Sequence, residues 1–227
     1  MENTMDFKYR TARRLPVILL LDTSGSMFGE KIDVLNSSIQ SMLNDFASVD
    51  SSEVEICVAI YQFGPEAQEV LPLMSAAEAE KKFTSMSADG STPLGSVLRL
   101  AKNSLLENRE AITSRDYRPI VLLASDGEPN DSWETAFEEF CSEGRSAKCT
   151  RMAIAIGVYD GDKAHDMLKN FVTKDQKVFS ASDAREIRAF FQIFSQTTVA
   201  KASSITATIK SEQGLKTIIE EDDDDIF

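Results

Sequence analysis

A short apolar run that ends in an acidic, hydroxyl-rich loop most constrains the fold of this chain. Val17–Leu21 is apolar and is bounded by Pro16 and Gly25, which is typical of a buried parallel strand. The sequence Asp-Thr-Ser-Gly-Ser follows at once as residues 22–26. In open α/β sheets, ligands bind beyond the carboxyl ends of the strands, where the strand order reverses. We therefore expect a polar site directly after this strand.

Two further segments carry matching chemistry: Ser91-Thr92-Pro93 opens a stretch with helical spacing, and Ser125-Asp126-Gly127 follows the apolar run 120–124. Taken alone, Thr92 is equally typical of a helix N-cap before a proline. Asp126 is equally typical of a turn, and the loop 22–26 of one that bonds its own amides. Together the three segments offer only hard oxygen ligands, which select Mg²⁺, Ca²⁺ or Mn²⁺. The candidate metal ligands are Asp22, Ser24, Ser26, Thr92 and Asp126.

The rest of the chain alternates strands and helices. Strands are expected at residues 17–21, 54–63, 69–71, 120–124, 152–157 and 178–179. Helices are expected at residues 32–46, 76–83, 94–105, 133–141 and 167–171, and from 184 onward. This pattern predicts an α/β fold with a doubly wound, mostly parallel sheet of about six strands, one antiparallel edge strand and helices on both faces. In the Rossmann strand order, the strands ending at Leu21 and Ala124 are neighbours, which places Asp22 beside Asp126.

At these residues the chain resembles a von Willebrand factor A domain, over roughly residues 15–200. The matched positions of that family's metal-ion-dependent adhesion site are, in order, Asp22, Ser24 and Ser26 (its DxSxS motif), Thr92 and Asp126. The resemblance implies a Rossmann-like fold and a Mg²⁺ site, with Mn²⁺ or Ca²⁺ as alternatives. It also implies that the three hydroxyls bind the ion directly while the two aspartates act largely through water or hydrogen bonds. An ion held mostly by neutral oxygens stays electrophilic and can accept an Asp or Glu of a partner protein.

Within the family, Leu15-Pro16 and residues 126–133 look most like the bacterial TerY-type proteins of tellurite-resistance and stress loci. This likeness implies a non-enzymatic scaffold that is encoded with protein kinases and phosphatases, one of which would be its partner. Asn130 stands where the pattern has a hydroxyl residue, so the metal ligands are intact but the partner-facing loop differs.

The alternative function is a Mg²⁺-dependent phosphatase-like enzyme with Asp22 as its nucleophile. That chemistry needs a second aspartate two residues later as general acid, and Ser24 stands there instead. A Ser-His-Asp hydrolase would have to use His165, the one histidine of the sequence, which lies far along the chain from Ser24. We therefore expect a binding module rather than an enzyme.

Composition and length limit the other possibilities. The 227 residues carry a net charge of −13, which argues against nucleic acid as a direct ligand, because a phosphate backbone needs a basic face. An apolar stretch of the ~20 residues needed to span a membrane is missing, and so is a signal-peptide pattern at the start, which predicts a cytoplasmic protein without membrane attachment. We expect an N-terminal arm (1–14) carrying Arg10, Arg13 and Arg14, the main domain (15–202) and a C-terminal extension (203–227).

Two features outside the metal motif could contact partners. Met27-Phe28 and Trp133 lie beside the expected site, and aromatic and Met residues are typical interface anchors; packing under the loop is an equally good interpretation of Met27-Phe28. The acidic run Glu220–Asp225 is typical of a solvated, disordered tail. If the segment before it is flexible, a tail carboxylate could instead cap the metal of its own or a neighbouring chain. Cys57 is expected in the core, and the other cysteines lack metal-site spacing.

Overall fold

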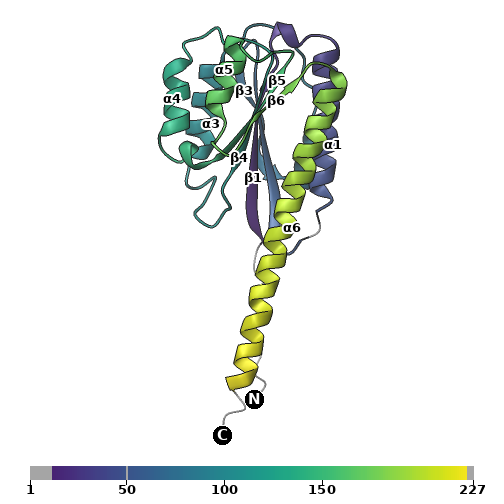
Figure 1. The fold of residues 1–227 in the computed structure, drawn as a ribbon, viewed down its shortest axis with the longest axis vertical. Coiled ribbons are helices and arrows are strands. Elements are labelled where there is room, and N and C mark those ends of the chain that lie inside the picture. Colours follow the sequence, from purple (N-terminus) through teal and green to yellow (C-terminus); the bar gives the residue numbers. More distant parts are fainter. Residues whose placement is uncertain (1–11, 50, 224–227) are drawn as a thin grey trace.

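The computed structural model describes residues 12–49 and 51–223. From residue 207 on, it describes the backbone alone. Its described part contains one six-stranded sheet in the order β3-β2-β1-β4-β5-β6 (Figure 1). The strands are β1 (Arg13–Asp22), β2 (Val54–Phe63), β3 (Ala67–Ser75), β4 (Ile120–Ser125), β5 (Thr150–Ile156) and β6 (Val178–Ala181). All neighbouring pairs are parallel except β2 with β3. The predicted doubly wound sheet with an antiparallel edge strand is confirmed.

Helices cover both faces of this sheet. They are α1 (Glu30–Ala47), α2 (Ala76–Lys82), α3 (Leu94–Ala101), α4 (Glu134–Ser142), α5 (Lys163–Phe171) and α6 (Ala184–Asp223). A π-helical turn, η2 (Lys102–Leu106), continues α3, and two short 3₁₀ turns are η1 (Gly25–Met27) and η3 (Ser146–Lys148). In Figure 1, α3, α4 and α5 lie on one side of the sheet, and α1 and α6 lie on the other.

The central strand β1 explains why its sequence is apolar without interruption. Leu19 and Leu21 pack into the core under α1, α2 and α6, while Ile18 and Leu20 pack into the core under α3, α4 and α5. Successive side chains of a strand point to opposite faces, so a strand covered on both faces needs apolar residues at every position. In the sheet, β1 lies between β2 and β4.

The start of β1 corrects two expectations from the sequence. Pro16 does not bound the strand but lies inside it, where β1 pairs with β2 alone, because pairing with β4 begins only at Val17. A proline is tolerated where the ladder is incomplete. Arg13 and Arg14 open β1 instead of preceding it as a solvated arm. They are held by Tyr117 and Asp116, respectively. Arg10 lies outside the described residues.

The last helix corrects the expected flexible extension. Helix α6 is 40 residues long and packs its aromatic stripe Phe190, Phe191 and Phe194 into the core. It then continues through 203–223 as a helix that projects from the body, away from the carboxyl ends of the parallel strands (Figure 1). About 20 residues at 1.5 Å each correspond to about 30 Å.

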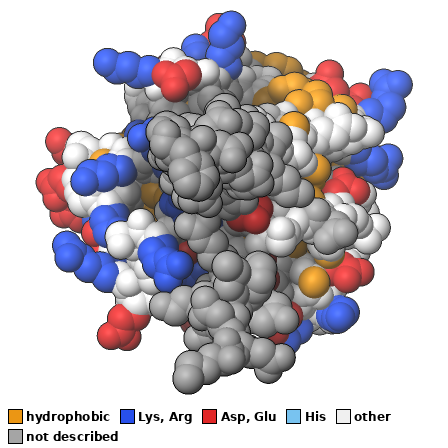
Figure 2. Space-filling view, turned by 90° about the horizontal axis from the view of Figure 1, so that it is seen from below, with side chains coloured by type: hydrophobic (Ala, Val, Ile, Leu, Met, Phe, Trp, Pro, Cys, Tyr) orange, Lys and Arg blue, Asp and Glu red, His pale blue; other side chains and the backbone are white. Residues whose placement is uncertain are grey.

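This projection contradicts self-capping of the site by the described acidic residues 220–223, since the helix carries them away from it. Asp224 and Asp225 lie outside the described residues. Figure 2 looks at the molecule from the end at which α6 projects and shows acidic and basic side chains together around the rim of this face. Within the described residues, every helix is too short or too polar to cross a bilayer.

Candidate metal site

The candidate site lies at the carboxyl ends of β1 and β4, where the strand order reverses. These strands are parallel neighbours, with Leu21 opposite Ala124, so the loops that follow them begin side by side. Asp22 is the last residue of β1, and Asp126 comes directly after β4. The predicted proximity of the loops that carry the two aspartates is confirmed, and this is the place where open α/β sheets bind ligands.

Asp22 is completely buried and both its carboxylate oxygens are engaged. Oδ1 accepts a hydrogen bond of 2.9 Å from the Ser24 amide, and Oδ2 accepts one of 2.7 Å from Ser125 Oγ. Burial raises the pKa of Asp22, and the hydrogen bonds from Ser24 and Ser125 oppose part of this rise. A cation in the site would favour the charged carboxylate. Asp22 therefore holds the loop in place from the protein interior, and its carboxylate does not face solvent.

A chain of hydrogen bonds joins three of the predicted residues. Ser24 Oγ and Ser26 Oγ lie 3.0 Å apart, and Ser26 Oγ donates to Asp126 Oδ1 over 2.6 Å. Ser24 is buried, Ser26 is exposed, and the Asp126 side chain has no exposed surface. Two hydroxyl oxygens and a carboxylate thus converge between the two loops.

Thr92 is tied to the loop after β4 through its backbone. The Thr92 amide donates to Asn130 Oδ1 (3.0 Å), and the Asn130 amide donates to the Thr92 carbonyl oxygen (3.2 Å). The residue that departs from the family pattern therefore joins two of the site's loops. Thr92 itself is 7% exposed.

The helix-capping interpretation of Thr92 is wrong, because the N-cap of α3 is Pro93. The Asp131 carboxylate, from the loop after β4, takes over this capping role. It accepts hydrogen bonds from the amides of Gly95 (3.0 Å) and Ser96 (2.9 Å). A carboxylate at a helix N-terminus also interacts favourably with the helix dipole. The end of the Thr92 loop and the start of α3 are thus both held by residues of the β4 loop.

Close backbone contacts join the same loop to the one after β1. The Gly25 amide donates to the Gly90 carbonyl oxygen (3.1 Å), and the Asp89 amide donates to the Thr23 carbonyl oxygen (2.9 Å). Gly64, in the turn after β2, packs against both loops, since an added Cβ would lie 2.6 Å from the Thr23 carbonyl oxygen and 2.9 Å from that of Asp89. These contacts hold all three loops in one arrangement.

Lys31 is a site residue that sequence reasoning missed. Its ammonium donates to Asp126 Oδ2 over 2.6 Å and to the Ser26 carbonyl oxygen over 3.3 Å. Lys31 lies in the first turn of α1, where the helix dipole disfavours a cation. A cation at this unfavourable position is the feature of the sequence that could have indicated an acidic partner for Lys31 elsewhere in the chain. Ser125, which orients Asp22, was likewise not assigned a role.

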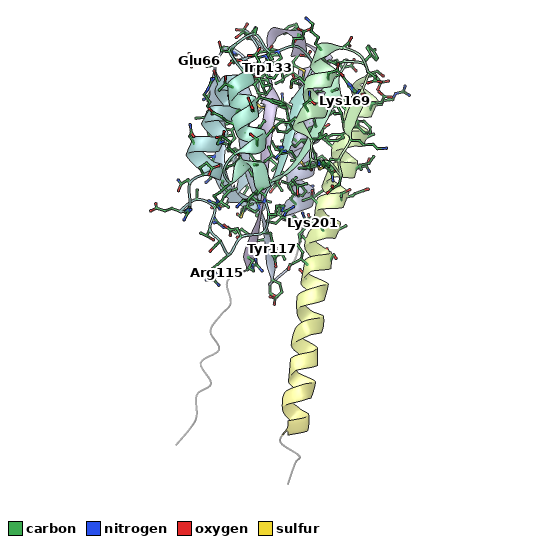
Figure 3. The ribbon with its side chains drawn as sticks, turned by 60° about the vertical axis from the view of Figure 1, so that its left-hand side comes forward. Glu66, Arg115, Tyr117, Trp133, Lys169 and Lys201 are labelled. Carbon is green, nitrogen blue, oxygen red and sulfur yellow. The ribbon has the colours of Figure 1, made fainter. Side chains whose placement is uncertain are left out.

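The two residues after the metal loop behave differently from each other. Met27 is completely buried, whereas the Phe28 side chain is 80% exposed. Packing is therefore the correct interpretation for Met27, and an exposed position is correct for Phe28. Trp133 lies at the same end of the sheet in Figure 3, opposite the end marked by Arg115 and Tyr117. It is half-buried and packs edge-on against Phe137, with ring centroids 5.3 Å apart.

Other candidate chemistry is engaged elsewhere. His165 Nε2 lies 3.2 Å from Ser180 Oγ, and its ring also faces Asp160. Cys57, as predicted, is buried, and all three cysteines are free thiols. Within residues 12–49 and 51–223, no group of three or more His, Cys, Asp or Glu could hold a metal. The predicted ligands at the carboxyl ends of β1 and β4 are hydroxyl and carboxylate oxygens, and such a set fits a hard divalent ion.

The comparisons with known proteins agree with this fold. A sequence model of the von Willebrand factor type A domain matches residues 17–193. No curated protein sequence matches the chain. Among solved structures, the pilus adhesin SpaC from Lactobacillus rhamnosus GG aligns with a TM-score of 0.68 at 14% identity, over 85% of this chain and 31% of that one.

Two further structures are similar. Proximal thread matrix protein 1 from the mussel byssus, with a zinc-occupied metal-ion-dependent adhesion site, aligns with a TM-score of 0.62 at 16% identity, over 83% of this chain and 46% of that one. BatB from Bacteroides thetaiotaomicron aligns with a TM-score of 0.56 at 16% identity, over 82% of this chain and 99% of that one. At these identities the likeness concerns the fold, and the chain spans less than half of the adhesin and the byssus protein.

Proposed function

The chain belongs to the von Willebrand factor type A domain family, and we propose that it is a non-enzymatic, metal-dependent module that binds a carboxylate of a partner protein. The observation that carries this proposal is the hydrogen-bonded series Ser24–Ser26–Asp126 at the carboxyl ends of β1 and β4. These side chains offer oxygen ligands, with no histidine or thiol among them. They lie at the carboxyl ends of strands, where open α/β sheets bind ligands.

The proposed ion is Mg²⁺, with Mn²⁺ or Ca²⁺ as alternatives. Ser24, Ser26 and Thr92 would supply direct oxygen ligands, and Asp22 and Asp126 would act through water or hydrogen bonds. Support comes from Asp22, whose two oxygens accept from the Ser24 amide and Ser125 Oγ. Residues that orient ligands in this way typically change metal affinity by about 10–100-fold when removed. The zinc ion of the byssus protein is a property of that structure.

A partner carboxylate is the expected ligand because the ion would carry few direct negative charges. Mg²⁺ demands octahedral coordination and usually keeps several waters, so an Asp or Glu from outside can replace one of them. Phe28, 80% exposed and two residues after Ser26, offers an apolar contact beside that position. The pilus adhesin with the same fold is consistent with a role in binding proteins.

The alternative, a phosphatase that uses Asp22, is less well supported. A nucleophile must reach the substrate, but the Asp22 side chain is completely buried and both of its oxygens accept hydrogen bonds. Ser24 stands where a general acid would be needed. We therefore keep the binding module as the function, with the reaction as an outcome that a Mg²⁺-dependent phosphatase assay would reveal.

The biological setting is proposed from the TerY-type resemblance alone. It implies a scaffold of a bacterial tellurite-resistance, stress or defence system, with a kinase or phosphatase of the same locus as partner, and the cytoplasmic location stays a prediction from the sequence. Asn130 changes the partner-facing loop relative to that pattern, so the partner's binding surface should differ as well.

Calorimetric titration with MgCl₂, MnCl₂ and CaCl₂ tests the metal site directly. We expect saturable binding of at least one ion to the wild type, and its loss in the double variant Ser24→Ala/Ser26→Ala. Ser142→Ala is the matched control, since its hydroxyl bonds a carbonyl at the end of α4. Equal affinity in all three proteins, or no binding by any, would contradict the proposal.

A further inference from the structure

An ion pair already engages one carboxylate of the candidate site. Lys31 Nζ donates to Asp126 Oδ2 over 2.6 Å and to the Ser26 carbonyl oxygen over 3.3 Å. The Asp126 side chain has no exposed surface, whereas the Lys31 side chain is 37% exposed. The other oxygen of the same carboxylate accepts from Ser26 Oγ. A lysine ammonium is thus separated from a proposed metal ligand by one carboxylate.

We propose that Lys31 is an internal cation that competes with the metal ion for Asp126 and so sets the metal concentration at which the site loads. This inference rests on the proposed function of the site. Like charges at such short range repel strongly inside a protein, and a carboxylate neutralised by an ammonium attracts a second cation less. Release of the ammonium from Asp126 would then favour loading of the metal, whether Asp126 acts through water or through the Ser26 hydroxyl.

The surroundings of Lys31 give its side chain a path to leave. Its end passes over Gly157, where an added Cβ would lie 3.6 Å from Nζ and 3.7 Å from Cε. Beside it is an open cavity of about 240 Å³ lined in part by Lys31, Gly157 and Asp183. Glu30 and Asp183 also line this cavity, and the Asp183 carboxylate, 45% exposed, pairs with Arg185 and accepts from the Glu186 amide. The ammonium can therefore move toward solvent while the core packing of α1 stays in place.

The chemistry of lysine suits a releasable contact. Lysine presents a point charge on a flexible stem, whereas arginine holds a carboxylate with a planar fork of two parallel bonds. Lys31 makes one bond to Asp126, and its position in the first turn of α1 is unfavourable for a cation. The contact between Lys31 and Asp126 is therefore short, but breaking it costs little free energy once a divalent ion offers Asp126 a stronger charge.

The decisive experiment compares Mg²⁺ affinities by calorimetry at fixed pH and ionic strength. We expect Lys31→Met to bind Mg²⁺ about tenfold more tightly than the wild type. Lys169→Met is the matched control: it removes the same charge from another ion-paired lysine, whose partner Asp160 lies on the surface. The control should bind Mg²⁺ like the wild type. Unchanged or weaker affinity in Lys31→Met would overturn the competition and leave Lys31 as a residue that positions Asp126.

Thermal unfolding gives a second readout that separates the two roles. Without metal, Lys31→Met should unfold at a lower temperature than the wild type, because Asp126 loses its partner in a buried position. With saturating Mg²⁺ this deficit should shrink or reverse, since the ion replaces the ammonium. A purely structural lysine would give the same deficit under both conditions, which would overturn the inference.

Failure of the metal site itself would look different. If the wild type, Asp22→Asn and Lys31→Met all fail to bind Mg²⁺, the proposed function is overturned and this inference with it. If the wild type binds, Asp22→Asn does not, and Lys31→Met binds no more tightly, only the competition is overturned.

Discussion

Two ion pairs lie at opposite ends of the adjoining strands β1 and β4, and they are built differently. At the start of the strands, Arg14 holds Asp116 through two bonds, Nε to Oδ1 (3.0 Å) and Nη2 to Oδ2 (2.6 Å). At their carboxyl ends, Lys31 holds Asp126 through a single bond of 2.6 Å. Both carboxylates are nearly or fully buried. Both ion pairs include a bond of 2.6 Å. Arg14, however, holds its partner with a two-bond fork, whereas Lys31 makes a single point contact that is easier to release.

The hydrogen bonds around the two carboxylates differ as well. Asp116 Oδ2 also accepts from the Thr113 amide, so the protein itself satisfies both of its oxygens. Asp126 shares its carboxylate between a lysine and Ser26, a proposed metal ligand. Protein donors engage both oxygens of each carboxylate, but Asp116 is held by more of them, from Arg14 and from the Thr113 amide and hydroxyl, than Asp126 is. The comparison thus favours a structural role for the end at Arg14 and agrees with the proposed ligand exchange at the end at Lys31.

The largest expected effect is that of Asp22→Ala, which acts at the carboxyl ends of β1 and β4, the proposed ligand-binding end. It removes the acceptor of the Ser24 amide and of Ser125 Oγ, and two buried donors left unpaired cost about 2–6 kcal/mol. The sheet should still fold, but the rise of the unfolding temperature with Mg²⁺ should disappear, because only a metal bound to the folded state produces such a rise. Differential scanning fluorimetry with EDTA and with Mg²⁺ measures both effects. An undiminished Mg²⁺-dependent rise in Asp22→Ala would exclude Asp22 from the site.

A change at the other end should affect stability without affecting metal binding. Arg14→Met leaves the largely buried Asp116 without its cation and should lower the free energy of unfolding by about 2 kcal/mol, as measured by urea denaturation. The loss should be the same with EDTA and with Mg²⁺. If the loss depended on Mg²⁺, the two ends would be coupled and the comparison would fail.

The sequence predicts where the strands end, but it does not predict the ion pairs that lie at the two ends. The strands around Asp22 and Asp126 could be predicted because a strand buried on both faces is apolar throughout, and because polar residues then mark its end. Neither ion pair could be predicted, since each joins residues about a hundred positions apart that only the sheet register brings together. Asp131 was missed for the same reason, because the helix that it caps begins 37 positions earlier, at Leu94.

Local patterns misled in two places where tertiary context decides the outcome. Pro16 reads as a strand boundary, but the incomplete pairing there lets β1 include it. The polar segment from Ser203 reads as a flexible tether, yet α6 continues through it. Sequence alone also leaves Met27 and Phe28 equivalent, because adjacent residues of a turn differ only in the direction of their side chains.

The dependence of stability on pH sharpens the assignment of the Arg14 end. Burial alone would raise the pKa of Asp116, but the hydrogen bond from Arg14, with those from Thr113, lowers it below its usual value. A lowered pKa contributes stability that is present above the pKa of the unfolded chain, about 3.9, and is lost as pH falls through the folded value. The difference in unfolding free energy between wild type and Asp116→Asn should therefore be constant from about pH 5 to 7 and shrink below about pH 4. A difference that grows toward low pH would contradict the stabilised carboxylate.

The smallest effect on stability is expected at Phe28, and its neighbour supplies the contrast. Met27→Ala should cost about 2–5 kcal/mol, because it empties a fully buried position. Phe28→Ala should change the unfolding free energy by less than about 0.5 kcal/mol, since the side chain is 80% exposed. Mg²⁺ affinity should be unchanged in Phe28→Ala, while metal-dependent binding of a partner should weaken, because an exposed aromatic beside the ion is a typical interface anchor. A large stability loss in Phe28→Ala would show that this ring packs against the fold and is not an interface anchor.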